Sequence, residues 1–190
     1  MTIYPLVMTT DPAIEPVDLN EMKAYLKIDD DTDDLVLQTM ITTAVSECEN
    51  FTGRALINRG YSLFMDNFPK QGSVTLPKPP MASVTQVLIY DAADASNVWH
   101  ADNYSVDGAS LLARVVLKNQ GQAPISTRQV NGIEIQYIAG YGTAAGDVPS
   151  ALISGIKRRV ADLYEHRGDG AITKSGAEMF WQDYRILGVS

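Results

Sequence analysis

The stretch VDLNEMKAYLKIDDDTDDLVLQTMITTAVSECENFTGRAL (17–56) predicts a short capped helix, an acidic turn and a long amphipathic helix. Asp18 is a suitable N-cap for the first helix, and Glu21 follows three residues later, where a capping box places its acid. In the second helix, apolar residues recur at helical spacing from Leu37 onward, and Gly53 occupies the position typical of a left-handed C-cap. The segment therefore offers two helix faces for packing and a dense block of negative charge, with no pattern typical of a catalytic site.

The composition is that of an ordinary globular protein. Its 190 residues suffice for one substantial domain, or for one domain that carries an inserted lobe. The single cysteine, Cys48, excludes an internal disulfide, and its place on the apolar side of a predicted helix makes it a small core residue. Residues 1–16 lack the pattern of a signal peptide, and no run approaches the ~20 apolar residues of a membrane span. We therefore expect a soluble protein made in a reducing compartment.

The net charge of −8 is unevenly distributed. Residues 1–50 carry eleven acids and two lysines, which gives −9, whereas the other 140 residues carry twelve acids and thirteen bases, which gives +1. A reader of duplex DNA needs a basic patch to displace counterions, so this pattern argues against that class. It indicates either a surface that repels polyanions or meets a basic partner, or a solvated helix end that charge keeps soluble.

Residues 57–142 change from helical to extended patterning. Their runs are rich in Val, Ile, Leu and Tyr and are bounded by turn-forming residues, as strands are. The predicted strands lie at 60–68, 73–77, 84–91, 103–106, 111–117 and 133–138. The alternation that begins at Ile133 predicts one buried face and one wet face, and Asp107-Gly108 predicts a hairpin turn.

Helical spacing returns over residues 149–167. We therefore predict an α+β fold with a ring-forming helical core, formed by 1–56 and 143–170 with two N-terminal helices and the helix near 149–167, and an inserted antiparallel β lobe at 57–142. The extended C-terminal tail 171–190 has weak periodicity but many large apolar groups, so we expect it to dock on its own domain or on a neighbour.

Tests for chemical motifs are negative. With Asp29 as the first ligand of a calcium loop, the sixth position holds Asp34 where Gly is needed, and the twelfth holds Met40 where Glu is needed. The glycine-rich turn before the last helix lacks the Lys-Ser or Lys-Thr pair of a phosphate loop. His100 and His166 have no second His at i+4 and no nearby Cys, which argues against zinc. Spacing alone leaves a Ser-His-acid triad open, but no nucleophile elbow is present. We therefore predict no catalytic residue, no cofactor and no metal, and a protein that is not an enzyme.

Two charged clusters are candidate contact sites. The acids, assigned to a channel wall or a subunit contact, are Asp29, Asp30, Asp31, Asp33 and Asp34. The bases, assigned to a subunit contact, are Lys157, Arg158, Arg159 and Arg167. Three consecutive helical residues spread over most of a turn, so these bases form either a solvated face or a contact with an acidic neighbour, such as the acids of another copy. Head-to-tail contacts of that kind close into rings when the rotation permits.

Taken together, the residues resemble the head–tail connector proteins (adaptor or head-completion proteins) of long-tailed bacteriophages and gene-transfer particles. The resemblance rests on the order of several segments across residues 14–170. They are VDLNEMKAYLKIDDDTDD, ENFTGRAL, LPKPPMASVTQVLIYD, NYSVD, IEIQYIAGYG and VPSALISGIKRRVADLYEHRGD.

The resemblance implies a structural protein of the virion that is made in the host cytoplasm. It implies a ring, typically dodecameric, beneath the portal at the head–tail junction, with a head-closure or tail-terminator neck protein attached below and no membrane. DNA would pass through the ring without sequence-specific binding during packaging and ejection. C-terminal segments of the family reach toward the portal, which gives these candidate portal contacts: Phe180, Trp181, Tyr184, Ile186 and Leu187.

The alternative from another class is a β lobe that binds carbohydrate or peptide. Trp99, Tyr104, Tyr137 and Tyr141 would then supply the stacking surface, although aromatic residues in strands more often belong to a core. A small hydrolase is a third interpretation, but no two carboxylates are paired by the sequence pattern.

Overall fold

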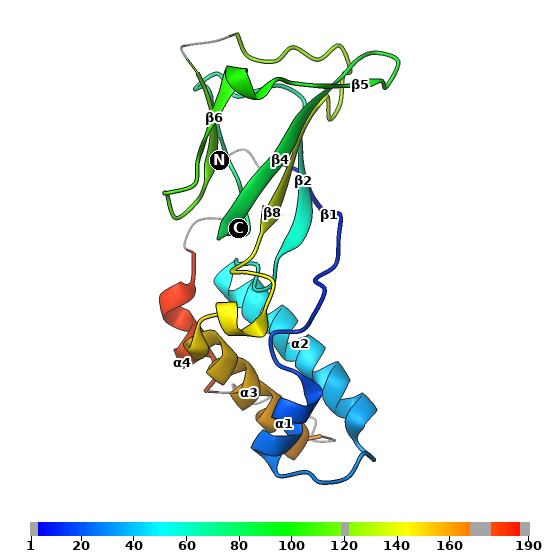
Figure 1. The fold of residues 1–190 in the computed structure, drawn as a ribbon, viewed down its shortest axis with the longest axis vertical. Coiled ribbons are helices and arrows are strands. Elements are labelled where there is room, and N and C mark those ends of the chain that lie inside the picture. Colours follow the sequence, from blue (N-terminus) through cyan, green and yellow to red (C-terminus); the bar gives the residue numbers. More distant parts are fainter. Residues whose placement is uncertain (1–3, 119–121, 168–175, 187–190) are drawn as a thin grey trace. The chain divides into compact units, whose positions relative to one another are not determined.

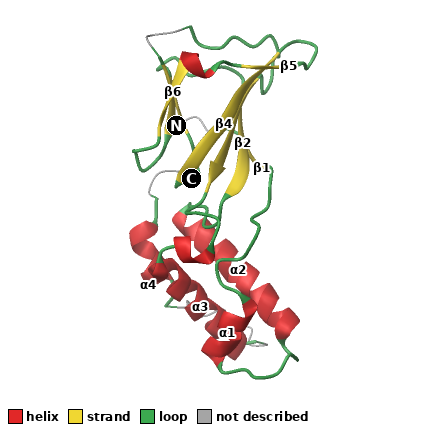
Figure 2. Ribbon diagram, in the orientation of Figure 1, coloured by secondary structure: helices red, strands yellow, loops and turns green. Residues whose placement is uncertain are grey.

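The computed structural model describes residues 4–118, 122–167 and 176–186. Within these ranges the chain has four α-helices and two antiparallel sheets, so the predicted α+β class is confirmed. Figure 2 shows the four α-helices apart from the strands, with one short helical turn among the strands next to β6.

The chain divides into two compact units, each built from two separate stretches of sequence. The sheet unit comprises Met1–Pro12 and Asn58–Tyr141, and the helical unit comprises Ala13–Ile57 and Gly142–Ser190. The strands are thus inserted between two helical stretches, with limits one residue inside the expected 57–142.

The N-terminal segment differs from the expectation that 1–56 belong to the helical core. Strand β1 (Leu6–Met8) pairs antiparallel with β2 (Arg59–Met65), which places it in the sheet unit. The amide of Thr9 extends this pairing by donating to the carbonyl of Gly60 at 2.8 Å. Three residues carry too little pattern to predict a strand, because β1 finds its hydrogen-bond partners only in a distant segment.

The helical unit follows the start and stop signals of the sequence. Its helices are α1 (Leu19–Leu26), α2 (Asp34–Thr52), α3 (Ser150–Glu165) and α4 (Glu178–Trp181), with short 3-10 turns η2 (Ala145–Asp147) and η3 (Gln182–Tyr184) (Figure 1). The Asp18 carboxylate accepts from the amide of Glu21 at 2.7 Å, so the predicted N-cap is confirmed. Gly53 caps α2 at φ +75°, also as predicted. Helix α2 begins at Asp34, with Asp33 as its N-cap.

One apolar core joins these helices. The fully buried side chains of the helical unit include Met22, Leu37, Ile41, Ala44, Cys48, Leu152, Ile156 and Val160. Their 3.6-residue periodicity on α2 and α3 was visible in the sequence. The prediction that Cys48 is a core residue is confirmed, and its burial raises the pKa of the thiol.

The sheet unit contains a five-stranded and a three-stranded sheet. The larger sheet has the order β1-β2-β8-β4-β5, in which β4 is Met81–Tyr90, β5 is Ser96–Val98 and β8 is Ile133–Ala139. The smaller sheet has the order β3-β7-β6, in which β3 is Ser73–Thr75, β7 is Arg114–Leu117 and β6 is Tyr104–Asp107. A 3-10 turn, η1 (Ala101–Asn103), precedes β6. The predicted hairpin is confirmed, since β6 and β7 pair antiparallel around Asp107↔Arg114. Strand β5 was not predicted, because Ser96–Val98 is exposed and lacks apolar alternation.

Strand β8 is the centre of the larger sheet, between β2 and β4. Ile133, Ile135 and Tyr137 are buried on one face, as the alternation predicted. Tyr137 stacks on Tyr61 of β2 with ring centroids 5.6 Å apart. The opposite face was expected to be wet, but Glu134 on that face is only 5% exposed. A polar network surrounds it, as described below.

Candidate functional site

The acidic turn between α1 and α2 is closed by cations and amides of its own chain. Lys23 Nζ on α1 donates to the carboxylates of Asp31 at 2.5 Å and Asp34 at 2.7 Å. These hydrogen bonds raise the pKa of Lys23, and the bond to Asp31 has the larger effect. Asp30 accepts from the amide of Thr32 at 2.9 Å, as aspartate does in a tight turn. Two of the five candidate acids are therefore ion-paired within the turn itself.

Asp33 connects the turn to the end of α3. Its Oδ2 accepts from the Tyr164 hydroxyl at 2.6 Å and from Arg167 Nη1 at 2.7 Å. The bond from Tyr164, followed by that from Arg167, lowers the pKa of Asp33. The Arg167 guanidinium also lies 4.3 Å from the centroid of the Tyr164 ring. An acid and a base that were candidates to pair between copies thus pair within one chain.

Arg159 is the least expected of the candidate bases. It is 7% exposed, and its guanidinium donates to both oxygens of Glu47 on α2, at 2.6 and 3.0 Å, and to Asp162 at 3.1 Å. The bonds to Glu47 are the leading cause that raises the pKa of Arg159. This two-pronged contact fixes α3 against α2, so the interpretation of the basic cluster as a solvated face does not hold for this residue.

The other charged candidates remain closer to solvent. Lys157 of α3 forms an ion pair with Glu21 of α1 at 2.5 Å, which joins the two helices. Arg158 is exposed and has no ion-pair partner among residues 4–118, 122–167 and 176–186. Asp29 and Asp30 are exposed as well. Of the two clusters, Arg158, Asp29 and Asp30 are the members left to meet a partner.

The C-terminal segment is anchored to its own helical unit by Trp181. This side chain is 3% exposed, and its Nε1 donates to the carbonyl of Leu152 in α3 at 3.3 Å. The indole lies against Gly155, where a Cβ would overlap the ring, and it makes a tilted contact with Phe51 at 6.0 Å between centroids. A glycine inside an otherwise apolar helical stripe was the one sequence signal of this close approach.

Further bonds hold the segment beside the C-terminal end of α2. Arg54 Nε donates to the carbonyl of Tyr184 at 2.7 Å, and the amide of Ile186 donates to the carbonyl of Thr52 at 3.0 Å. Arg185 lies over the Phe51 ring, 5.2 Å from its centroid. The expectation that this segment docks on its own domain or on a neighbour is met by its own domain for residues 176–186.

The predicted portal contacts are therefore not equivalent. Trp181 is occupied within the chain, and Tyr184 and Ile186 are half-buried. Phe180 is 44% exposed, and its neighbour Met179 is 81% exposed. Leu187 lies outside the described residues. Docking of Trp181 thus leaves Met179 and Phe180 as the apolar side of α4 that faces outward.

In the sheet unit, Glu134 is the centre of a buried polar network that sequence reasoning did not find. Its carboxylate accepts from Ser62 Oγ at 2.6 Å, Tyr90 Oη at 2.5 Å and Gln136 Nε2 at 2.7 Å. Burial raises the pKa of Glu134, but these three hydrogen bonds outweigh it, and the pKa is lowered. Gln86 extends the network by donating to Gln136 at 2.9 Å. The carboxylate is fully engaged, so its role is to hold three neighbouring strands together.

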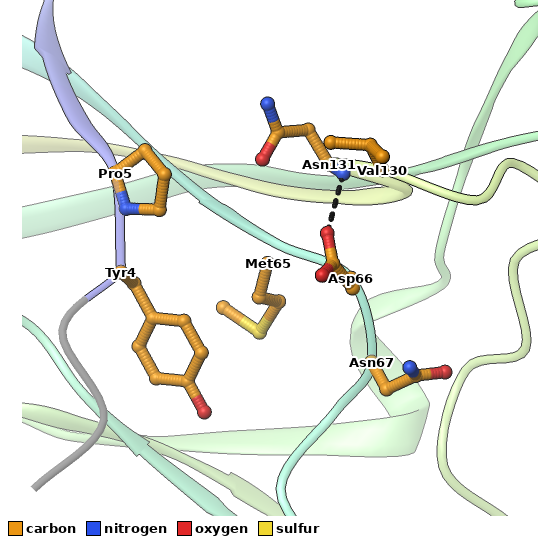
Figure 3. Close-up of a pocket in the computed structure, with 7 residues that line it drawn as sticks. All are labelled: Tyr4, Pro5, Met65, Asp66, Asn67, Val130 and Asn131. Carbon is orange, nitrogen blue, oxygen red and sulfur yellow. Dashed lines mark hydrogen bonds between the residues drawn. The ribbon is translucent and has the colours of Figure 1, made fainter.

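A shallow cavity of about 480 Å³ lies in the sheet unit (Figure 3). Its wall is formed by Tyr4, Pro5, Met65, Asp66, Asn67, Val130 and Asn131. Asp66 Oδ1 accepts from the amide of Asn131 at 2.8 Å, which closes one side. A single carboxylate with no histidine or cysteine in the wall supplies no acid–base pair and no nucleophile.

The described residues carry no group of three or more His, Cys, Asp or Glu side chains that could hold a metal ion. In the same part of the chain, none of the helices has the length and apolarity needed to cross a bilayer. The aromatic residues of the alternative carbohydrate site are largely internal. Tyr104 and Tyr137 are buried, and Trp99 stacks on Tyr104 with centroids 5.3 Å apart. Two of the four residues of that stacking surface are therefore withdrawn from solvent.

Comparison with known proteins decides the family. The family model described as Head completion protein matches residues 16–157. The chain belongs to this family. The predicted head-completion family is thereby confirmed, and membership supports a structural, non-enzymatic role in joining head to tail. No curated protein matches the chain.

Solved structures match this head completion protein over almost its whole length. A chain in the neck of a native gene transfer agent (GTA) particle, computed with C12 symmetry, is 26% identical at a TM-score of 0.79, and the match covers 97% of this chain and 98% of that chain. A chain in the neck of an empty GTA particle, computed with C6 symmetry, is 24% identical at a TM-score of 0.82, with the same coverage. A chain in the virion of the native gene transfer agent is 24% identical at a TM-score of 0.81, covering 96% of this chain and 97% of that chain.

Proposed function

We propose that this head completion protein forms a ring at the head–tail junction of a virion, between the portal and a head-closure or tail-terminator neck protein. The observation that carries the proposal is the end-to-end similarity to a chain in a particle neck computed with C12 symmetry. Twelve-fold rotational symmetry is the arrangement that a closed series of identical head-to-tail contacts produces. We transfer the dodecameric ring to this chain on that basis.

The charge of the two units supports passive passage of DNA. The helical unit contains sixteen acids and nine bases, a net −7, and the sheet unit contains seven acids and six bases, a net −1. A negative wall repels phosphates, so DNA slides through a ring of such units without being held. Asp29 and Asp30, the exposed acids of the turn outside its ion pairs, face either DNA or an adjacent copy in this proposal.

The portal contact is assigned to the outward side of α4. Met179 and Phe180 are exposed apolar side chains on a segment that Trp181 fixes in place. A pre-ordered apolar pair loses little conformational entropy when a partner covers it. This assignment replaces the wider set of anchors expected from the sequence, because Trp181 contributes to the core of its own unit.

Assembly with purified portal tests the proposal. The protein is mixed with portal, and the complex is followed by light scattering and imaged by electron microscopy. We expect rings of this protein stacked on the portal, with or without rings in the absence of portal. A mixture that shows only free monomers would contradict the proposed function.

The portal contact is tested by Phe180→Ser, which leaves Trp181 in place. We expect attachment to portal to weaken at least about tenfold, because exposed aromatic side chains dominate such contacts. Ile125→Ser is the matched control, since Ile125 is an 80% exposed apolar residue of the sheet unit. If both variants attach as the unmodified protein does, α4 is not the portal contact.

A further inference from the structure

The outer face of α2 carries no charged side chain of its own. Its central line runs along Leu35, Thr39, Thr42, Ser46 and Asn50. Within this fully described helix, no residue in the exposed class is Asp, Glu, Lys or Arg. The charged residues of α2 lie off this line, and each bonds to another part of the helical unit. They are Asp34, Glu47 and Glu49, which bond to Lys23, Arg159 and the amide of Leu56, respectively.

This composition does not serve helix stability in water. Thr, Ser and Asn are among the weaker helix formers, and a solvated helix face is normally rich in Lys and Glu. Leu35, at one end of the line, is 81% exposed, an arrangement that water disfavours. The exposed part of α3, by contrast, includes Arg158 and Glu165. The face therefore has the composition of a contact area, in which charged residues are depleted.

The three threonine hydroxyl groups on this face already have partners. Thr39 Oγ1 donates to the carbonyl of Leu35 at 2.9 Å, and Thr43 Oγ1 donates to the carbonyl of Thr39 at 2.8 Å. Thr42 Oγ1 donates to Glu15 at the edge of the face, also at 2.9 Å. Covering these threonines would therefore leave none of their hydroxyl donors unsatisfied.

Charge identifies the occupant. A basic partner would be attracted to the acids of the helical unit and would gain nothing from a neutral face. A second copy of this chain carries the same −8 charge, and two such copies repel each other wherever their acids meet. The neutral face of α2 is where a second copy can approach with least repulsion. We propose that the outer face of α2 packs against the helical unit of the neighbouring copy in the ring; this inference rests on the proposed function.

The size of the face suits a ring better than an isolated pair. From Leu35 to Asn50 the helix rises about 22 Å, and a helix face is about 10 Å wide. The resulting few hundred Å² fall short of the ~800 Å² per partner in a stable two-protein complex. Such a contact holds when the closure of the ring or binding to a portal brings many copies together.

Cysteine substitution tests the proposal with little perturbation. Cys48 is fully buried, so Ser46→Cys introduces an accessible thiol at the centre of the face. Ser154→Cys on α3 is the matched control, at an exposed serine of the same unit. In the assembled ring we expect the thiol at 46 to react with a maleimide at least about tenfold more slowly than in the free protein, with the thiol at 154 changing less. A thiol-to-amine cross-linker carried at position 46 is expected to join two copies of this chain, as identified by mass spectrometry.

Charge substitutions provide a second measurement. We expect Ser46→Glu and Ser46→Lys each to lower the assembled fraction at least about tenfold, because either sign would be buried without a partner. Ser154→Glu is expected to assemble normally. Assembly of both Ser46 variants like the unmodified protein, equal disruption by Ser154→Glu, or cross-links to portal alone would overturn this inference and leave the proposed ring standing. If the unmodified protein fails to assemble with portal, both proposals fall.

Discussion

Gly155 lies against the indole of Trp181, so the effect of Gly155→Ala on stability should change sign when that indole is removed. Gly155→Ala places a methyl group where the indole of Trp181 lies. In an isolated helix the same change stabilises by about 1 kcal/mol, because glycine loses more backbone entropy than alanine. The contact with the indole opposes this gain.

The expected magnitudes follow from burial and packing. Overpacking a filled site costs about 1–3 kcal/mol, so Gly155→Ala alone should be neutral or destabilise by up to about 2 kcal/mol. Trp181→Ala removes a side chain that is 3% exposed, which costs about 3–5 kcal/mol. With the indole gone, Gly155→Ala should stabilise by about 1 kcal/mol, which gives a coupling of about 1–3 kcal/mol between the two positions.

The assay is urea unfolding of the four proteins of the double-mutant cycle, followed by circular dichroism at 222 nm. Gly146→Ala is the control, because a Cβ there meets nothing within 4 Å, and its effect should stay within about 0.5 kcal/mol. If Gly155→Ala has the same effect with and without Trp181, the indole does not pack on α3, and the anchoring of the C-terminal segment is wrong.

Three further predictions concern the charged contacts. Arg159→Ala should destabilise the protein in urea by about 2–4 kcal/mol, and Arg159→Lys should restore less than half of that, because lysine cannot make the two-pronged bond to Glu47; full rescue by lysine would contradict this. The pKa of Glu134 is lowered on folding, so the stability that its ionised carboxylate contributes is complete above the ordinary pKa of 4.5 and is lost as the pH falls through the folded-state pKa. Glu134→Gln should therefore flatten the decline of Tm below about pH 4.5. An unchanged decline would show that other carboxylates cause it. Asp33→Asn should lower Tm only slightly, and less at high salt, because its bond to Arg167 is partly exposed; a large, salt-independent fall in Tm would contradict that.

Local signals in the sequence were sufficient for most elements of the fold. Caps such as Asp18 and Gly53 act through hydrogen bonds within a few residues, so these two helix limits could be read directly, whereas helix α4 lies in a tail that was expected to be extended. The alternation on β8 predicted its buried face, because successive side chains of a strand point to opposite faces of the sheet. Strands β1 and β5 escaped prediction, because three exposed or half-buried residues become a strand only when a partner strand supplies their hydrogen bonds.

The sequence by itself determined the α+β class, the helical periodicity of the core, the concentration of acids near the N-terminus and the resemblance to head completion proteins. The tertiary structure alone decided which charges remain available to a partner. Asp33 and Arg167 are 134 positions apart in the chain, and Arg159 and Glu47 are 112 apart, yet each pair is bonded. The folded helices also turned Trp181 inward while leaving the face of α2 uncovered. Ion pairing and burial depend on distances through space, and no local pattern encodes these until the helices have packed.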